Sequence, residues 1–155
     1  MVNMENLTAV RRTDNRDPDF LNLVGLLNED LASRNGELQR QYNAYNSVDG
    51  IDAAVVAYCG CVPVACGAIR RHSDDTVEIK RMFVAASHRR MGLARQILSE
   101  LENAARGLGY RRAILETGVR QVEAIGLYQS MGYRTIENYG GYAGNTNSVC
   151  MGKYL

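Results

Sequence analysis

The stretch from Arg89 to Ala94 reads RRMGLA, and the rest of the chain is best interpreted outward from it. It follows a strand-like apolar segment, Thr76 to Val84, and opens a helical pattern. The first turn of a helix has backbone N–H groups without intrahelical partners and carries partial positive charge, so it binds phosphate well. Gly92 would let an anion approach the backbone, and the flanking arginines add charge. Alone, the pattern also fits an ordinary basic helix start.

On the carboxyl side of this stretch, helices and strands alternate. Apolar residues every three or four positions predict a helix over Met91–Leu108, and the glycines at 107 and 109 terminate it. We then expect a strand over Arg112–Thr117, a helix over Gln121–Met131, and strands over Tyr133–Glu137 and Ser148–Tyr154.

On the amino side, Asp17-Pro18-Asp19 predicts a helix start, with a capping acid, a proline in the first turn and an acid favoured by the helix dipole. Asn35-Gly36 ends this helix. Leu38–Tyr45 fits a second, short helix. The expected strands are Leu7–Arg11, Ala53–Cys59, Val62–Arg70 and Thr76–Val84.

This order of elements indicates an α/β fold with a mixed, mostly antiparallel sheet. The strand–helix–strand unit from Thr76 to Thr117 predicts a right-handed parallel crossover. The 155 residues contain no repeat or linker, so we expect a single domain over residues 1–155.

Composition narrows the function classes. The net charge of +1 gives no bulk attraction to nucleic acid or to an anionic membrane. The sequence shows neither a long apolar run nor a secretory signal at its start. The four cysteines do not follow zinc-site spacing, which favours reduced thiols in a cytoplasmic protein over a redox or metal role. We therefore expect no metal site and neither a nucleic-acid nor a membrane partner.

Three segments taken together carry a family resemblance. They are VEIKRMFV at 77–84, RRMGLA at 89–94 and EAIGLYQSMGY at 123–133. In this order and spacing they resemble the GNAT superfamily of acetyl-coenzyme-A-dependent N-acetyltransferases, over roughly Val55 to Tyr133. The family's phosphate-loop pattern is Gln or Arg, two residues, Gly, one residue, then Gly or Ala; here Arg89, Gly92 and Ala94 supply it.

The resemblance implies an acetyl-CoA site where two parallel strands, ending at Val84 and Thr117, splay apart in the middle of a sheet covered by helices on both faces. The pantetheine arm would bond to the backbone of Met82 and Val84, and the pyrophosphate to N–H groups of Arg90–Arg95. The implied cofactor-binding residues are Met82, Phe83, Val84, Arg89, Arg90, Met91, Gly92, Leu93, Ala94, Arg95, Gln121 and Tyr128. Gln121 departs from the family, which most often has asparagine there.

The resemblance also places Tyr128 where the family keeps a tyrosine that protonates the departing thiolate, a role that suits a phenol near sulfur. The alternative is a core aromatic of an amphipathic helix. Attack on a thioester passes through an oxyanion, which the backbone N–H of Val84 would stabilise, as in relatives.

Glu78 is the candidate general base, because some family members use a glutamate at this spacing, sometimes through water. An alkylammonium has a pKa of roughly 10 and cannot attack before it loses a proton. Simple pairing of Glu78 with a neighbouring cation remains an alternative. Strand alternation predicts Glu78, Lys80, Met82 and Val84 on one face, and Ile79, Arg81 and Phe83 on the other.

The acceptor is less constrained by the sequence. Glu29 and Asp30 could hold a cationic amine or could simply be solvated, whereas Arg81 or Arg120 could hold a substrate carboxylate. Tyr142 belongs to a loop rich in Tyr, Gly and Asn that resembles a binding loop. We expect a small-molecule amine and a homodimer, as in many relatives. A protein or peptide amine remains an alternative, as does a non-catalytic coenzyme A sensor or interaction module.

Overall fold

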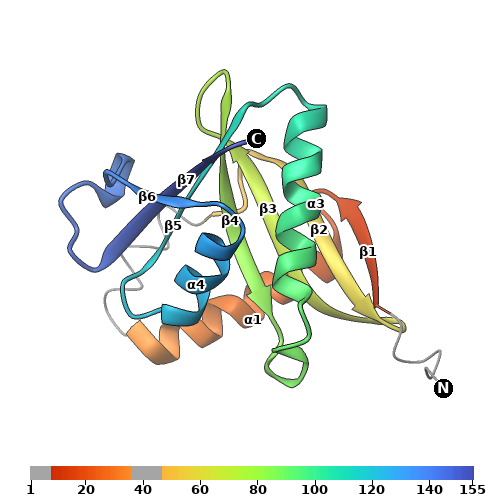
Figure 1. Ribbon diagram of the computed structural model, residues 1–155. Coiled ribbons are helices and arrows are strands. Elements are labelled where there is room, and N and C mark those ends of the chain that lie inside the picture. The colour runs from red at the N-terminus through yellow and green to blue at the C-terminus, as the bar shows by residue number, and fades with distance from the viewer. Residues whose placement is uncertain (1–7, 36–46) are drawn as a thin grey trace.

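A computed structural model describes residues 8–35 and 47–155. Within these ranges seven strands form one sheet in the order β1-β2-β3-β4-β5-β7-β6 (Figure 1). In chain order the elements are β1 (Thr8–Thr13), α1 (Pro18–Asn35), β2 (Ile51–Cys59), β3 (Val62–Arg71), β4 (Thr76–Val84), α3 (Leu93–Gly107), β5 (Arg112–Gly118), α4 (Val122–Ser130), β6 (Arg134–Ile136) and β7 (Ser148–Tyr154). Short 3₁₀ turns lie at Ala86–His88 and Gly140–Tyr142.

The predicted α/β class and element order are confirmed, with shifts of a few residues at element ends. The first strand, for example, continues to Thr13 rather than ending at Arg11. The short helix expected at 38–45 lies outside the described residues.

β4 and β5 are the parallel pair in the middle of this otherwise antiparallel sheet. Their register runs from Thr76 opposite Arg112 to Ile79 opposite Leu115 and then stops. Both strands continue beyond that point, β4 to Val84 and β5 to Gly118. The expected splay is therefore present, and it opens at the carboxyl ends of the two strands.

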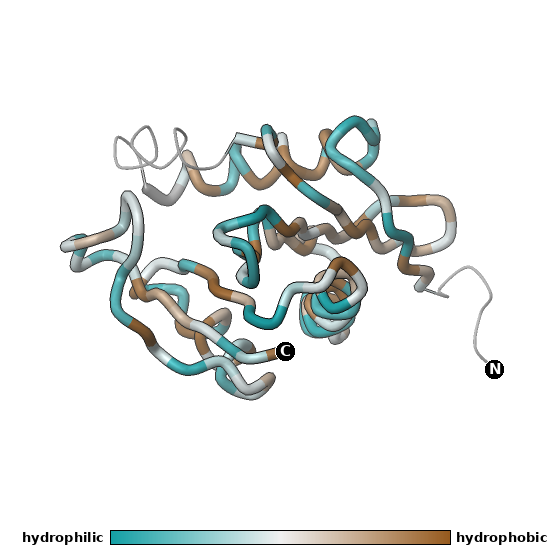
Figure 2. The backbone as a smooth tube through the Cα atoms, turned by 90° about the horizontal axis from the view of Figure 1, so that it is seen from above, coloured by the Kyte–Doolittle hydropathy of each residue, from teal (hydrophilic) through white to brown (hydrophobic). Residues whose placement is uncertain are grey.

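Helices cover both faces of the sheet (Figures 1 and 2). The larger core lies under α3 and α4, where Ile97, Leu98 and Leu101 of α3 pack on the strands. The smaller core lies under α1, where Phe20, Leu23 and Val24 pack on β2 and β3. In α1 and α3 the apolar residues that recur every three or four positions are thus mostly buried against the sheet.

A bulge in β4 overturns the simple alternation predicted for this strand. Lys80 pairs with Ala68 and Phe83 pairs with Cys66, so Arg81 and Met82 together oppose the single residue between Ala68 and Cys66. Arg81 takes up the extra residue with φ 59°. A bulge reverses the alternation that follows it.

As a result, Met82 and Val84 pack with Ile79 against the α3 core, whereas Phe83 packs against the α1 core. Arg81 also faces α1, because its guanidinium donates to Asn28.

Gly67 lies opposite the bulge, and side chains of α3 come close to it. A Cβ at this position would lie 2.6 Å from Met82 Sδ and 2.8 Å from both Ile97 Cγ2 and Leu101 Cδ1. A side chain there would displace either α3 or the bulge. Gly67 therefore helps to hold the strand irregularity that shapes the site.

Asp17 caps α1, and its removal should destabilise the fold. Its Oδ1 accepts the N–H of Asp19 at 2.9 Å and its Oδ2 accepts Arg11 at 2.6 Å. Burial tends to raise its pKa, but hydrogen bonds from Thr13, Asp19 and Arg11 outweigh this and lower the pKa below 3.8. A lowered carboxyl pKa contributes stability above the unfolded pKa and loses it as the pH falls through the folded one.

We expect Asp17→Ala to lower the unfolding free energy by about 1–2 kcal/mol at pH 7 in urea denaturation, with the deficit shrinking toward acid pH. Asp74→Ala is the control, because that side chain is 96% exposed and should change stability by less than about 0.5 kcal/mol. Equal effects of the two substitutions would contradict the capping role.

Candidate active site

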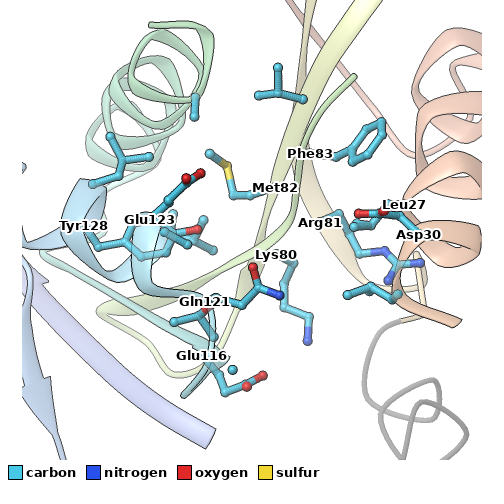
Figure 3. Close-up of a pocket in the computed structure, with 18 of the residues that line it drawn as sticks. Leu27, Asp30, Lys80, Arg81, Met82, Phe83, Glu116, Gln121, Glu123 and Tyr128 are labelled. Carbon is cyan, nitrogen blue, oxygen red and sulfur yellow. The ribbon is translucent and has the colours of Figure 1, made fainter. Parts of the chain in front are cut away.

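A cavity of about 970 Å³ opens where β4 and β5 separate. In Figure 3, β4 runs between α4, which carries Tyr128 and Glu123, and α1, which carries Leu27 and Asp30. The walls of the cavity come from β4, the first turn of α3, the end of β5 with the turn after it, α4 and α1. The predicted cofactor, catalytic and acceptor regions therefore meet in one space.

One end of the cavity is suited to phosphate. Gly92 is the N-cap of α3 with φ 77°, and it makes no side-chain cap. Because the Gln96 N–H is the first to bond back, to the Gly92 carbonyl, the N–H groups of Leu93 to Arg95 have no partner within the helix. Arg90 also has positive φ, 65°, and such turns group N–H donors into anion-binding concavities. Within the described ranges, no atom beyond the residues adjacent in the chain lies within 4 Å of a Cβ built on Gly92, so the approach is open.

The arginines around this loop also anchor it. Arg89 Nε donates to the Val84 carbonyl at 3.0 Å, and its Nη2 lies 3.7 Å from Asp30 of α1. Arg95 donates to Ser130 Oγ at the end of α4 at 2.8 Å. These contacts hold the phosphate-binding turn against both side walls of the cavity.

The structure brings eleven of the twelve predicted cofactor residues to the cavity. The exception is Met91, which is 52% exposed and does not line it. Its position before the αL residue Gly92 lets the chain turn its side chain outward. Gln121 does line the cavity, at the N-cap of α4.

The β5-facing side of β4 beyond Ile79 pairs with no strand of the described residues. Main-chain groups along such an edge can bond an extended ligand in the manner of an added strand. The Val84 carbonyl already accepts Arg89, so a ligand could not use this acceptor without competition.

Tyr128 lies on α4, lines the cavity and also belongs to the core. Its ring contacts the edge of Tyr133, with centroids 5.9 Å apart. Burial, with a smaller contribution from the charge of Glu116, raises the pKa of Tyr128 to about 12. Its phenol therefore keeps its proton at neutral pH.

Glu78 lines the cavity but is firmly held. Its Oε2 accepts the hydroxyl of Tyr139 at 2.6 Å, and its Oε1 lies 3.7 Å from Lys80 Nζ. Glu78 therefore faces the cavity and is also paired with a neighbouring cation.

Glu116 is a site residue that the sequence reasoning missed. It follows Leu115, the last residue of β5 paired with β4, and lines the cavity. Burial, with a smaller contribution from Glu78, raises its pKa to about 7, against the lowering effects of Ser148, Lys80 and Tyr142. The signal in the sequence was an acid that ends the apolar run RAIL in an expected buried strand.

The predicted acceptor residues divide into two groups. Arg81 and Tyr142 are buried and line the cavity, as does Asp30. Glu29 is exposed and does not line it, because it lies on the part of α1 that faces away. Arg120 lines the cavity from an exposed position in the turn after β5.

Among the described residues, no helix has both the length and the apolar character needed to cross a membrane.

Comparison with known proteins agrees with this geometry. The sequence model of the Acetyltransferase (GNAT) family matches residues 19–133. An uncharacterized N-acetyltransferase of Bacillus subtilis is 40% identical over 92 residues, which cover 58% of this chain and 61% of that protein. Such matches span between 34% and 61% of the length of the first few curated relatives.

Two solved structures share the whole fold. One is a Klebsiella pneumoniae protein described as an acyl-CoA N-acyltransferase, with a TM-score of 0.79, 27% identity, and coverage of 97% of this chain and 99% of that one. The other is a GNAT acetyltransferase of Elizabethkingia anophelis with acetyl-CoA bound, with a TM-score of 0.69, 19% identity, and coverage of 96% and 98%. The family match covers well over half of the chain, and the chain therefore belongs to the GNAT acetyltransferase family.

Proposed function

We propose that this protein is an N-acetyltransferase that moves the acetyl group of acetyl-CoA to the primary amine of a small molecule. One observation carries the proposal: a single cavity joins the open helix start at Gly92 to two carboxylates, the buried Glu78 and the half-buried Glu116, and to the buried Tyr128. An acyl donor with a pyrophosphate at one end and a thioester at the other suits such a cavity.

The residues present fit this donor. The free N–H groups at the start of α3 and the open space at Gly92 suit its pyrophosphate. The unpaired edge of β4, with Met82 and Val84, suits an extended pantetheine arm. Acetyl-CoA supplies a thioester, whose carbonyl carbon is open to attack by an uncharged amine.

Side chains of the protein would then remove a proton from the amine and supply one to the sulfur. In the transfer a C–N bond forms and the C–S bond breaks, the amine nitrogen loses a proton and the sulfur gains one. Glu78 is the base that the resemblance favours, directly or through water. We infer that Glu116 is the better one, because an acceptor with a pKa near 7 is matched to neutral conditions, whereas Glu78 is engaged by Tyr139 and Lys80.

Tyr128 would be the general acid. It lines the cavity and holds its proton at neutral pH, so it can donate a hydrogen bond or the proton itself to the departing sulfur.

A small-molecule acceptor is favoured because the acceptor side is a walled cavity that includes the buried Arg81 and Tyr142. A peptide amine is the runner-up, and a coenzyme A sensor is the non-catalytic alternative. A cytoplasmic location is part of the proposal and is supported by four free thiols, one of them exposed, which suit a reducing compartment. A homodimer is also part of the proposal, and its only support is the analogy with many relatives.

Release of free thiol from acetyl-CoA, measured with a broad panel of amines, tests the proposal. Amine-dependent release supports catalysis. Binding of acetyl-CoA with no release from any amine, small or peptidic, would favour the sensor.

Cofactor binding at the start of α3 gives a separate prediction. Acetyl-CoA at about a hundred times its dissociation constant should stabilise the protein by about 2.7 kcal/mol, a rise of several degrees in Tm. Gly92→Gln should reduce this shift strongly, because a side chain would enter the open space beside the donor N–H groups.

Gly109→Gln is the matched control. Gly109 also has positive φ, 91°, and open space around its Cβ position, but it lies beyond the other end of α3. It should carry a similar intrinsic strain yet keep the full acetyl-CoA shift. A shift retained in the Gly92 variant would rule out the helix start as the binding element.

A further inference from the structure

Arg81 is buried at the wall of the cavity and has no ion-pair partner in the described part of the chain. Only 8% of the residue is exposed, and it lines the space between β4 and α1. Its Nη2 donates to the neutral side-chain oxygen of Asn28 at 2.8 Å. Within residues 8–35 and 47–155, its Nε is the one buried side-chain nitrogen or oxygen that has no hydrogen-bond partner.

A guanidinium in this position is costly. Buried charges are normally paired, and a buried donor without an acceptor loses its hydration without compensation. No ion pair among the described residues includes Arg81. The backbone contributes a further cost, because a non-glycine residue at φ 59° is strained. That strain accompanies the bulge that turns the side chain to the α1 face.

The acids of the cavity do not neutralise this charge. Glu78 is paired with Lys80 at 3.7 Å, and Asp30 with Arg89 at 3.7 Å. Glu116 is only partly ionised at neutral pH, because its pKa is raised to about 7. Glu123 lies at the exposed rim, on α4. Among the described residues, the acceptor side therefore holds one buried cation without an acidic partner, Arg81, whereas Arg120 is exposed.

Apolar side chains also line the cavity beside Arg81, and Asp30 of α1 lies among them. Leu27 and Leu31 of α1 line the cavity together with Phe83 of β4. A ligand seated there would place an apolar body against these side chains and an anionic group at the guanidinium. Guanidinium donors match carboxylate geometry, so a carboxylate is the expected anion.

We propose that the acceptor is an amine that also bears a carboxylate, and that Arg81 binds this carboxylate through its Nε. The inference rests on the proposed acetyltransferase function and names the substrate class of the same site. It disfavours polyamines, because a second cation beside a buried, unneutralised guanidinium would be repelled.

The test compares matched acceptors in the thiol-release assay. Each amino acid of a panel, including phenylalanine for the apolar wall, is paired with its amide and with its decarboxylated amine. The best amino acid should exceed its amide in kcat/KM by about 30-fold or more, the loss expected when a buried charged contact is removed. Dipeptides with a free carboxyl end show whether the carboxylate belongs to an amino acid or to a longer chain.

Two variants locate the contact. Arg81→Met should bring the acid-to-amide ratio close to one. Asn28→Asp should also lower the acid-to-amide ratio, because it supplies an internal carboxylate to the guanidinium of Arg81. This variant keeps Arg81 and should fold even if Arg81→Met does not. Arg16→Met is the control, since that side chain is 87% exposed and lies outside the cavity, and it should keep the ratio of the unmodified protein.

The possible outcomes are distinct. Amides that work as well as acids, or a ratio that persists in both the Arg81 and Asn28 variants, would overturn the carboxylate assignment while leaving the acetyltransferase intact. If no amine of any panel supported thiol release, the proposed function itself would be overturned.

Discussion

Tyr128→Phe is expected to lower kcat by roughly 10²-fold or more with any amine that is a substrate. The substitution removes one hydroxyl and leaves the ring, which packs in the α3 core against Tyr133. The fold and the affinity for acetyl-CoA should therefore change little. The expected loss is in the chemical step, because the departing sulfur would lose its donor.

Tyr133→Phe provides the matched control. Tyr133 is also buried on the α4 side of the sheet, but its hydroxyl donates to Glu102 at 2.9 Å and it does not line the cavity. That variant should lose stability, because it leaves a buried carboxylate short of a donor, and should keep kcat. An unchanged kcat in the Tyr128 variant, measured under saturating acetyl-CoA, would remove Tyr128 from the role of acid.

The glycine-capped start of α3, where we propose that phosphate binds, could be predicted from sequence because every signal for it is local. Gly92 at a helix start, a preceding strand and clustered arginines are all within a few residues of one another. The apolar periodicity of α3 and the β-branched runs of β2 to β4 are equally local, and they gave the element order and the sheet class. Glu29 and Met91 do not line the cavity, because the direction of a side chain relative to a cavity depends on tertiary packing that the local sequence does not show.

The bulge at Arg81 could not be predicted in this way. It depends on Gly67 of the neighbouring strand, which leaves room for Met82 beneath α3. Strand alternation assumes an uninterrupted pleat, so it assigned Arg81, Met82, Phe83 and Val84 to the wrong faces relative to Glu78–Lys80. The error concerns function directly, because the bulge is what turns Arg81 toward the α1 side of the cavity.

Glu116 was missed for a related reason. From sequence, Glu78 and Glu116 are both acids in apolar strands, and only Glu78 lies at a spacing that the family resemblance marks. The two acids differ in their position relative to the point where the pairing of β4 with β5 ends. Glu78 lies within the paired region and is held by Tyr139 and Lys80, whereas Glu116 is the first residue of β5 beyond it. The raised pKa of Glu116 follows from burial at this position.

The difference between the two acids leads to the largest expected effect on rate. A general base must be ionised, so kcat of the unmodified enzyme should rise as the pH increases through about 7, the pKa of Glu116. Glu116→Gln should lower kcat at neutral pH by about 10²–10⁴-fold and abolish this rise, because the amide accepts no proton. The residual rate should depend on pH only as the amine itself titrates.

Glu78→Gln distinguishes the alternatives, because it keeps a hydrogen-bond acceptor for Tyr139 and removes only the charge beside Lys80. If Glu116 is the base, this variant should retain the rise in kcat. Its midpoint should shift toward lower pH, because the charge of Glu78 is one of the contributions that raise the pKa of Glu116. The reverse result, with the rise lost in Glu78→Gln and kept in Glu116→Gln, would assign the base to Glu78. Loss of the rise in both variants would instead indicate that the two carboxylates titrate as a coupled pair that shares the proton.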